Sequence, residues 1–284
     1  MKGFRVIERA RRDTLGEGPL WSERENALYW TDILGHRLNR YSLTSHAVSS
    51  WVIPGYVGWV IEREAGGLVV GLDRQVVLVT SEGTITEVIA ELSEEPPDNR
   101  VNDAKADALG RIWAGTMPVQ ADRSSGSLYR IDLNRSVHRL DRGYTIANGP
   151  AIADDGRFMY HTDTALGTIF KYEISAAGEL SPRMPFIVFE KDWGNPDGMT
   201  CDAEGCLWVA CWGSGSVMRF APNGHRETVI SLPASQLTSC TFAGAALDRM
   251  FVTSASMGSE DPIAGALFEI DPGCTGLRTR LFKG

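Results

Sequence analysis

Residues 195–215 read NPDGMTCDAEGCLWVACWGSG and contain the unit from which the chain is built. The stretch opens on Asp197 in a Pro-Asp-Gly turn, which neither continues a helix nor fits the middle of a sheet. A second turn, residues 202–205, precedes the apolar run 207–211, and a glycine-rich turn ends that run. The order is therefore acid, turn, buried strand, turn, and it recurs along the sequence.

The apolar runs recur at a nearly constant interval. Their second residues follow one another at spacings of 40 to 48, and most runs are followed by a strand in which apolar and polar residues alternate. Such alternation is typical of half-buried antiparallel strands, and six units of this length fall in the range of propeller blades. The runs are Leu28–Asp32, Leu68–Leu72, Ile112–Thr116, Met159–Asp163, Leu207–Cys211 and Met250–Ser254.

The sequence therefore predicts an all-β fold. We expect a six-bladed β-propeller of four-stranded antiparallel blades, formed as a single domain by residues 1–284, with the apolar runs as the inner strands that line a central channel. The ends of the chain are expected to close the ring, because closure removes an exposed sheet edge. Phe4–Ile7 is predicted to pair beside the C-terminal region 277–282.

Charge and composition argue against several classes of partner. The net charge is -8 and the isoelectric point is near 5.2, which disfavours nucleic acid and anionic membrane surfaces. No apolar stretch approaches the roughly 20 residues of a membrane helix, and the start MKGFRVIERARRD does not resemble a secretion signal. The basic run Arg9–Arg12 is expected to be solvated surface.

The cysteines indicate the compartment. There are five, an odd number, and none is in C-x-x-C spacing, which predicts small buried strand residues in a reducing environment rather than disulfides or a zinc cluster. We therefore expect a cytoplasmic protein, monomeric or weakly homo-oligomeric, with a small-molecule partner.

Polar residues of metal-ligand type lie 11 or 12 residues before the second residue of four of the runs: Glu17, Asn102, Asn148 and Asp197. Because equivalent blade positions converge at one end of a propeller channel, we expect these side chains to point at one place. Carboxylates buried together are unfavourable without a cation. Oxygen ligands favour calcium, magnesium or manganese, although zinc also accepts carboxylates. The alternative is that these residues merely cap turns.

Four segments, in order along the chain, resemble those of the SMP-30/gluconolactonase family, which includes regucalcin, sugar-acid lactonases and luciferin-regenerating enzyme. The resemblance covers essentially the full chain, and it implies a six-bladed propeller with one divalent metal ion, calcium first, in the channel. The segments are LGEGPLW at 15–21, RVNDAKADALGRIWAGTM at 100–117, IANGPAIADDGRFMYHTDT at 146–164 and PDGMTCDAEGCLWVACWGSGSV at 196–217.

This resemblance also implies roles for individual residues. The family's metal ligands fall on Glu17, Asn148 and Asp197, with Asp197 also as general base, and its substrate contacts fall on Arg100 and Asn102. The chain departs from the family at two places. Ala104 replaces the glycine of the R-x-N-D-G-K motif, and Pro118-Val119-Gln120 follows Met117, where regucalcin-like members have a glutamate. Regucalcin's substrate preference is therefore not carried over.

These residue types suit the hydrolysis of a lactone. A metal ion acting as Lewis acid stabilises the developing oxyanion, and Asp197 takes a proton from the attacking water. The sequence thus predicts a metal-dependent lactonase for a sugar aldonolactone of the gluconolactone or pentonolactone type. Two alternatives remain: a hydrolase that uses the same site on phosphotriesters or other esters, and a non-catalytic propeller that binds calcium or a protein partner.

Overall fold

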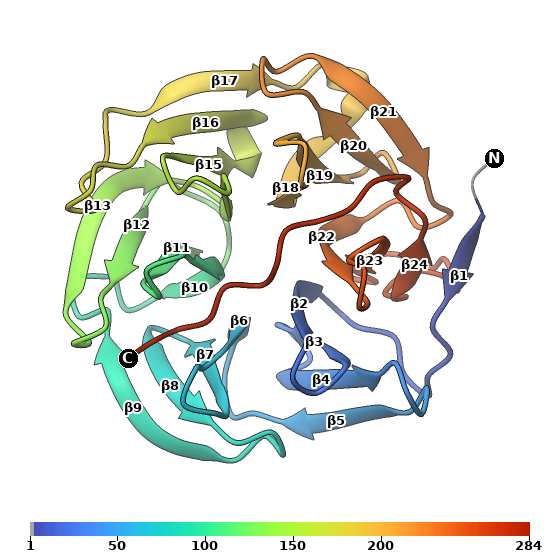
Figure 1. Cartoon of the computed structure of the whole chain (residues 1–284), viewed down its shortest axis with the longest axis horizontal. Helices are drawn as coiled ribbons and strands as arrows, with labels where there is room; N and C mark the ends of the chain where they lie inside the picture. The colour runs from blue at the N-terminus through green and yellow to red at the C-terminus, as the bar shows by residue number, and fades with distance from the viewer. Residues whose placement is uncertain (1–2) are drawn as a thin grey trace.

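A computed structural model describes residues 3–284; Met1 and Lys2, the first residues of the predicted domain, lie outside the described residues. Residues 3–284 form six four-stranded sheets arranged around a central axis (Figure 1). All strand pairs within these sheets are antiparallel. The predicted all-β, six-bladed propeller is confirmed. In this part of the chain no helix is long and apolar enough to cross a membrane.

The blades are built mostly from strands that follow one another in the chain. Blades 1 to 3 consist of β2 (Gly16–Ser22), β3 (Ala27–Asp32), β4 (Arg37–Ser42), β5 (Val48–Val52); β6 (Val57–Glu62), β7 (Leu68–Leu72), β8 (Gln75–Val79), β9 (Ile85–Glu91); and β10 (Asn99–Ala106), β11 (Ile112–Pro118), β12 (Gly126–Ile131), β13 (Val137–Tyr144). Blades 4 to 6 consist of β14 (Ala147–Ile152), β15 (Phe158–Asp163), β16 (Thr168–Glu173), β17 (Met184–Val188); β18 (Asn195–Cys201), β19 (Leu207–Trp212), β20 (Ser216–Phe220), β21 (Arg226–Ser231); and β22 (Leu237–Ala243), β23 (Arg249–Ser254), β24 (Phe268–Ile270), β1 (Phe4–Val6). Two 3-10 turns, η1 (Thr164–Leu166) and η2 (Lys191–Trp193), flank β16 and β18.

The last blade closes the ring with a strand from each end of the sequence. β1 is its outermost strand and pairs with β24, Phe4 opposite Ile270 and Val6 opposite Phe268. Closure by N- and C-terminal strands is therefore confirmed. The predicted partner region 277–282 is wrong, because the chain leaves the sheet after Ile270 and continues across one end of the propeller.

The strands that line the channel are β2, β6, β10, β14, β18 and β22, the first strand of each blade in the sheet order. The apolar runs predicted to be inner are instead the second strands. The second strand of a blade is mostly apolar and has a strand partner on each side, whereas the innermost strand has one edge without a strand partner and carries glycine, proline and polar residues.

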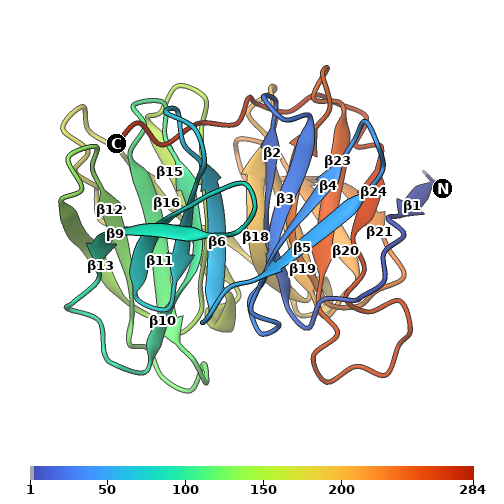
Figure 2. The same cartoon turned by 90° about the horizontal axis from the view of Figure 1, so that it is seen from below.

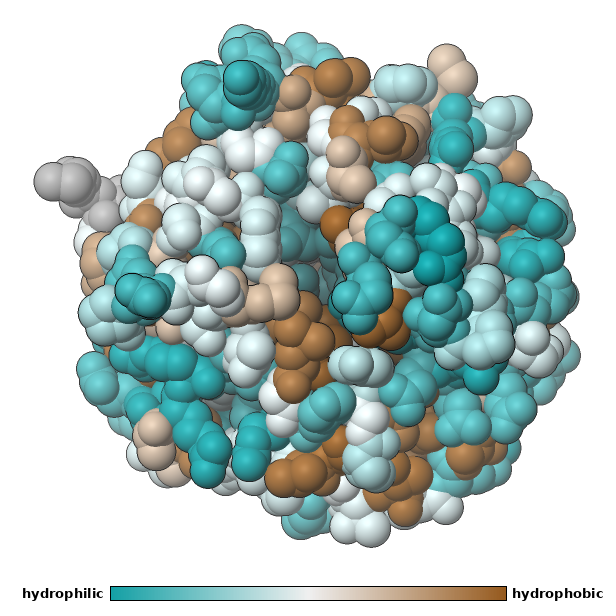
Figure 3. Space-filling model, turned by 180° about the vertical axis from the view of Figure 1, so that it is seen from behind, coloured by the Kyte–Doolittle hydropathy of each residue, from teal (hydrophilic) through white to brown (hydrophobic). Residues whose placement is uncertain are grey.

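Residues 272–284, here called the C-terminal strap, cross the channel end at which the innermost strands finish (Figures 1 and 2). The backbone of the strap hydrogen-bonds to four blades. Ala203 N–H donates to the Thr275 carbonyl, and Gly276 N–H donates to the Leu247 carbonyl. Phe282 N–H donates to the Glu62 carbonyl, and Lys283 N–H donates to the Gly110 carbonyl. A cavity of about 100 Å³ remains beneath it. The opposite face of the propeller is hollowed near its centre (Figure 3). The innermost strands begin at this end of the channel.

The cysteines are mostly buried, as predicted, but not all of them lie in strands. Cys201, Cys211 and Cys240 are buried in strands, and burial raises the pKa of each thiol to about 12. Cys206 is buried just before β19, and Cys274 is half-buried in the C-terminal strap, so the strand assignment is wrong for these two. Among the described residues all five cysteines are free thiols.

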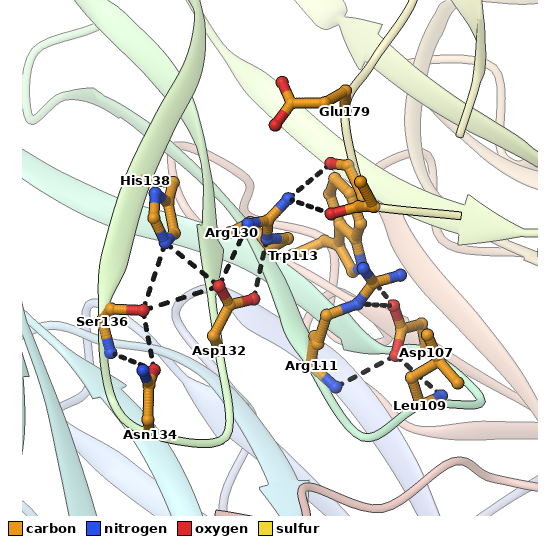
Figure 4. A network of polar contacts seen from close by, with 12 residues as sticks. Asp107, Leu109, Arg111, Trp113, Arg130, Asp132, Asn134, Ser136, His138 and Glu179 are labelled. Atoms are coloured by element: carbon orange, nitrogen blue, oxygen red, sulfur yellow. Dashed lines mark hydrogen bonds and ion pairs between the residues drawn. The ribbon is translucent and has the colours of Figure 1, made fainter. Parts of the chain in front are cut away.

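Blades 1, 3 and 5 each have a buried aspartate that accepts hydrogen bonds from a tryptophan and an arginine. In blade 3, Asp107 Oδ2 accepts hydrogen bonds from Trp113 Nε1 at 2.9 Å and Arg111 Nε at 2.7 Å, and the guanidinium lies over the indole ring (Figure 4). The corresponding sets are Asp13, Trp30 and Arg9 in blade 1, and Asp202, Trp208 and Arg219 in blade 5. Each set ties the second strand of its blade to a turn or to the N-terminal segment.

Asp107→Asn is expected to lower the free energy of unfolding by about 2–3 kcal/mol, because it removes the charge from a largely buried ion pair and places an amide N–H₂ among donors. For a domain of this size the midpoint of thermal unfolding should fall by roughly 4–10 °C. The matched control is Asp122→Asn, which removes an exposed partner of Arg123 and should change stability by less than about 1 kcal/mol. Equal effects of the two variants in calorimetry would contradict this account.

Candidate active site

The predicted site residues lie where four innermost strands are bulged. Two residues of each innermost strand oppose one residue of the second strand, after Glu17 in β2, at Asn102 in β10, after Asn148 in β14 and at Asp197 in β18. A bulge re-aims side chains and is frequent next to active sites. In blades 2 and 6 the register skips only one residue, and those blades contribute no carboxylate here.

The bulges also explain the Pro-Asp-Gly segment that reads as a turn. Pro196 and Asp197 are part of β18, not of a loop before it. β18 is the edge strand of its blade, and a proline is tolerated at an edge or a bulge because no ladder hydrogen bond is required of it there. The sequence prediction of a turn is wrong, whereas the predicted position of the carboxylate at the mouth of the channel agrees with the start of β18.

Three carboxyl groups are buried together at this end of the channel: Glu17, Asp103 and Asp197. Burial, with the charges of Asp197 and Asp103, raises the pKa of Glu17 well above its usual range. Burial and the charge of Asp103 do the same to the pKa of Asp197. The folded protein therefore disfavours the ionised form of both groups, as expected for acids that face each other without a cation.

One carboxylate oxygen of Asp197 is buried without a hydrogen-bond donor. It is 5% exposed, and its Oδ1 atom has no hydrogen-bond partner among residues 3–284. Asp103 Oδ2 is in the same situation, while its other oxygen accepts the N–H of Ala104. Buried oxygens without a donor are uncommon in folded proteins and usually mark a ligand, an ion or water.

A directional chain of hydrogen bonds connects blades 3, 4 and 5. Arg100 Nη1 donates to Asn102 Oδ1 at 2.7 Å, and Asn102 Nδ2 donates to Asn148 Oδ1 at 2.9 Å. Asn148 Nδ2 then donates to Thr164 Oγ1 at 2.9 Å, and this hydroxyl donates to the carbonyl of Pro196, next to Asp197, at 2.7 Å. The chain fixes the orientation of both amides and links Arg100 to the residue before the carboxylate.

Arg100 supplies a positive charge that acts on Glu17 and Asp197. Burial lowers the pKa of its guanidinium to about 10, opposed by the charges of Glu17, Tyr56 and Asp197. The group therefore remains protonated at neutral pH. Its Nε atom is buried with no partner in the described part of the chain. The charge of Lys105 opposes the rise in the pKa of Asp103, so one arginine and one lysine face three acids, and the cluster is short of positive charge when all three are ionised.

The donor set fits a hard divalent cation. No group of three or more histidine, cysteine, aspartate or glutamate side chains among residues 3–284 is arranged to hold a metal. Two of the three predicted ligands, Glu17 and Asp197, are of these types. The third predicted ligand is the Asn148 amide, whose Oδ1 has already accepted one hydrogen bond and has a second lone pair left. Carboxylate and amide oxygens are ligands typical of calcium.

All five predicted site residues thus lie in one buried cluster. Two further members had no assigned role in the sequence prediction. Asp103 follows Asn102 in the bulge of β10. Its position next to a predicted site residue was the signal that could have identified it as a member of the cluster. Thr164 gave no signal, because it follows β15 in the short turn η1, and it meets Asn148 through the pairing of β14 with β15 and Pro196 through the contact of blades 4 and 5.

Comparisons with known proteins identify the family of the chain. The sequence profile of the SMP-30/Gluconolactonase/LRE-like region matches residues 15–256. The 6-deoxy-6-sulfogluconolactonase of Pseudomonas putida is 33% identical over 277 residues, which are 95% of each chain. The pentonolactonase of Haloferax volcanii is 34% identical over 283 residues, 96% of this chain and 95% of that protein.

A solved structure has the same architecture over the full length. The calcium-binding protein regucalcin from Agrobacterium tumefaciens superposes with a TM-score of 0.93 at 28% identity, covering 100% of this chain and 98% of the other. The family profile spans most of the chain, and the two lactonases exceed 30% identity over nearly all of it. This protein belongs to the SMP-30/gluconolactonase/LRE-like family.

Proposed function

We propose that the chain is a metal-dependent lactonase that hydrolyses a sugar aldonolactone of the gluconolactone or pentonolactone type to the sugar acid. The observation that carries the proposal is the buried cluster of Glu17, Asp103 and Asp197 with the amide of Asn148, an arrangement that is unfavourable without a cation. The named lactonases among the relatives support the substrate class.

Glu17, Asn148 and Asp197 would hold the divalent cation, calcium before zinc, manganese or magnesium. When bound there, the ion supplies Lewis-acid polarisation of the lactone carbonyl. The relative described as a calcium-binding protein supports calcium. The free, buried thiols support a reducing, cytoplasmic location, and we propose a monomer or weak homo-oligomer with no nucleic acid or membrane partner.

Asp197 is proposed as the general base. Its unpartnered Oδ1 takes a proton from a water molecule while the water oxygen forms a bond to the carbonyl carbon of the lactone. The ring C–O bond then breaks, and the leaving ring oxygen receives the proton that Asp197 holds. The product is the open sugar acid, and Asp197 returns to its starting state.

Arg100 and Asn102 orient the substrate in this proposal. Arg100 Nε, which has no partner within the described chain, is available to a substrate oxygen. Both N–H groups of Asn102 are already used, one on the Ala147 carbonyl and one on Asn148. Asn102 is therefore left to accept a hydrogen bond from a sugar hydroxyl through Oδ1, while its amide positions Asn148.

The test is the initial rate of proton release from a panel of aldonolactones, with chelator-stripped protein to which calcium, magnesium, manganese or zinc is added back singly. Spontaneous hydrolysis is subtracted. Cation-restored hydrolysis of one or two sugars is the expected result. Cation binding without lactone hydrolysis would overturn the proposed reaction and would still support the proposed metal site. A phosphotriester panel, followed by a search for partner binding, would then test the two alternatives.

Thr164→Val is expected to weaken cation binding and to lower kcat/KM by about 10–100-fold, because it removes the hydroxyl that orients Asn148 and contacts the Pro196 carbonyl. Cation affinity from calorimetry and rates from the lactone assay are the measurements. Thr168→Val is the control, since within residues 3–284 that hydroxyl bonds only to the carbonyl of exposed Leu166. Unchanged cation affinity in Thr164→Val would show that the hydrogen-bond chain does not position the ligands.

A further inference from the structure

A second polar cavity lies on the side of blade 1, away from the channel. Its volume is about 590 Å³, and it is formed between the N-terminal segment and the outer strands β4 and β5. None of the described residues that line it belongs to an innermost strand. The polar lining residues used below are Arg9, Arg11, Arg12, Arg37, Asn39 and Ser50.

Several donors at this cavity have no acceptor. Asn39 is 3% exposed, and its Nδ2 atom makes no hydrogen bond within residues 3–284. Arg12 Nη1 and Arg9 Nε are likewise buried and unpartnered in the described part of the chain. Arg37 Nη1 donates to Ser50 Oγ at a long 3.3 Å. A buried amide without a partner is unfavourable, and an acceptor in the cavity would remove that penalty.

The acids at the cavity do not use these donors. Asp13 accepts two hydrogen bonds from the Arg9 guanidinium and one from Trp30, so the charges of Arg9 and Asp13 cancel. Asp32 accepts the backbone N–H groups of Thr14, Leu15 and Gly35. Against the one remaining negative charge, that of Asp32, the lining has three further arginines. The cavity is therefore locally positive in a protein whose net charge is -8.

We propose that this cavity binds the phosphate group of a small phosphorylated metabolite. Guanidinium groups, an amide N–H₂ and a hydroxyl together are donors, and a tetrahedral oxyanion offers several charged acceptors to such a set. The three unpartnered donors set this cavity apart from an ordinary solvated patch, in which water satisfies exposed arginines. The expectation that Arg9–Arg12 is only solvated surface is wrong, because the Arg9 side chain is buried and Arg12 Nη1 is buried as well.

The experiment is isothermal titration of chelator-treated, desalted protein with inorganic phosphate, at constant ionic strength and without calcium. We expect saturable binding at one site per chain. Arg12→Met and Asn39→Leu should each weaken it by about 10–100-fold, the range for a lost hydrogen bond to a charged group. Arg37→Met, a change nearer the surface, provides a third variant if Asn39→Leu folds poorly. Arg278→Met is the control, since that exposed arginine lies on the C-terminal strap.

Two comparisons identify the ligand. Tighter binding of a sugar phosphate than of inorganic phosphate supports a phosphate ester, and equal binding supports recognition of the phosphate group alone. Absence of binding, equal weakening in Arg278→Met, or equally tight binding of gluconate would each overturn the phosphate assignment. Lactone hydrolysis by Arg12→Met should equal that of the wild type, so failure of the lactonase proposal leaves this test unaffected.

Discussion

Asp197→Asn is expected to lower the rate of lactone hydrolysis by about 10²–10⁴-fold, the contribution typical of a positioned general base. The substitution keeps the shape of the side chain and removes its charge and its capacity to take a proton. Asp197 is also a proposed ligand, so calcium affinity should fall in the same variant. Initial rates on the preferred aldonolactone and calorimetric titration with calcium measure the two effects separately.

Saturating calcium distinguishes the two roles. If Asp197 only held the cation, activity of Asp197→Asn would return once the site was filled, whereas loss of the general base persists at any calcium concentration. Asp155→Asn, an exposed aspartate in the turn before β15, is the control and should retain full activity. Full activity and full calcium occupancy in Asp197→Asn would show that the reaction uses another base.

The convergence of the predicted site residues was largely predictable, because propeller geometry brings equivalent blade positions close together. Glu17, Asn148 and Asp197 lie on three blades and share no local motif, yet each has nearly the same offset from its apolar run. What the spacing could not show was the bulge. A two-residue bulge in an edge strand carries glycine and proline, and in sequence these residues resemble a turn.

Closure of the ring by both ends of the chain was predictable, but the strand that pairs with Phe4–Val6 was not. Phe4–Val6 needed a partner to cover the edge of the last blade, and both β24 and residues 277–282 lie near the C-terminus. The choice depends on contacts that no local pattern carries. Phe282 of the C-terminal strap is fully buried between blades 2 and 3, and its backbone hydrogen-bonds to the backbone of Glu62 and Glu64.

The hydrogen-bond chain was beyond sequence reasoning for the same reason. Asn102 and Asn148 are 46 residues apart and meet because adjacent blades place their innermost strands side by side. An asparagine can donate or accept at either position. Only the fixed direction of the chain, from Arg100 toward Pro196, shows that the Asn102 donors are used within the protein.

Removal of the cation is expected to make stability fall as pH rises. In the cation-free protein the pKa values of Glu17, Asp103 and Asp197 lie above those of the unfolded chain, with burial as the main cause. The folded state therefore binds more protons than the unfolded state between the two sets of values. The stabilising effect is complete below the unfolded values near pH 4 and is lost as pH rises through the higher folded values.

Calcium should oppose this loss, because a bound cation favours the ionised carboxylates. At a concentration 100 times its dissociation constant, a ligand of the folded state adds about 2.7 kcal/mol to stability, and each unit of pKa difference corresponds to about 1.4 kcal/mol. We therefore expect the difference in the midpoint of thermal unfolding between calcium-loaded and chelator-treated protein to be small near pH 5 and to grow toward pH 8. Because other titrating groups contribute to both samples, they cancel in this difference.

Asp197→Asn provides the internal check. In the chelator-treated state the variant lacks one of the three opposing charges, so it should be more stable than the wild type at pH 8 and should lose less stability between pH 5 and pH 8. The same variant is predicted to be nearly inactive, which is the combination expected where an active site stores unfavourable charge for its function. A wild-type protein that gains stability over this pH range without calcium would contradict the proposed repulsion, and the case for a cation between these carboxylates would be lost with it.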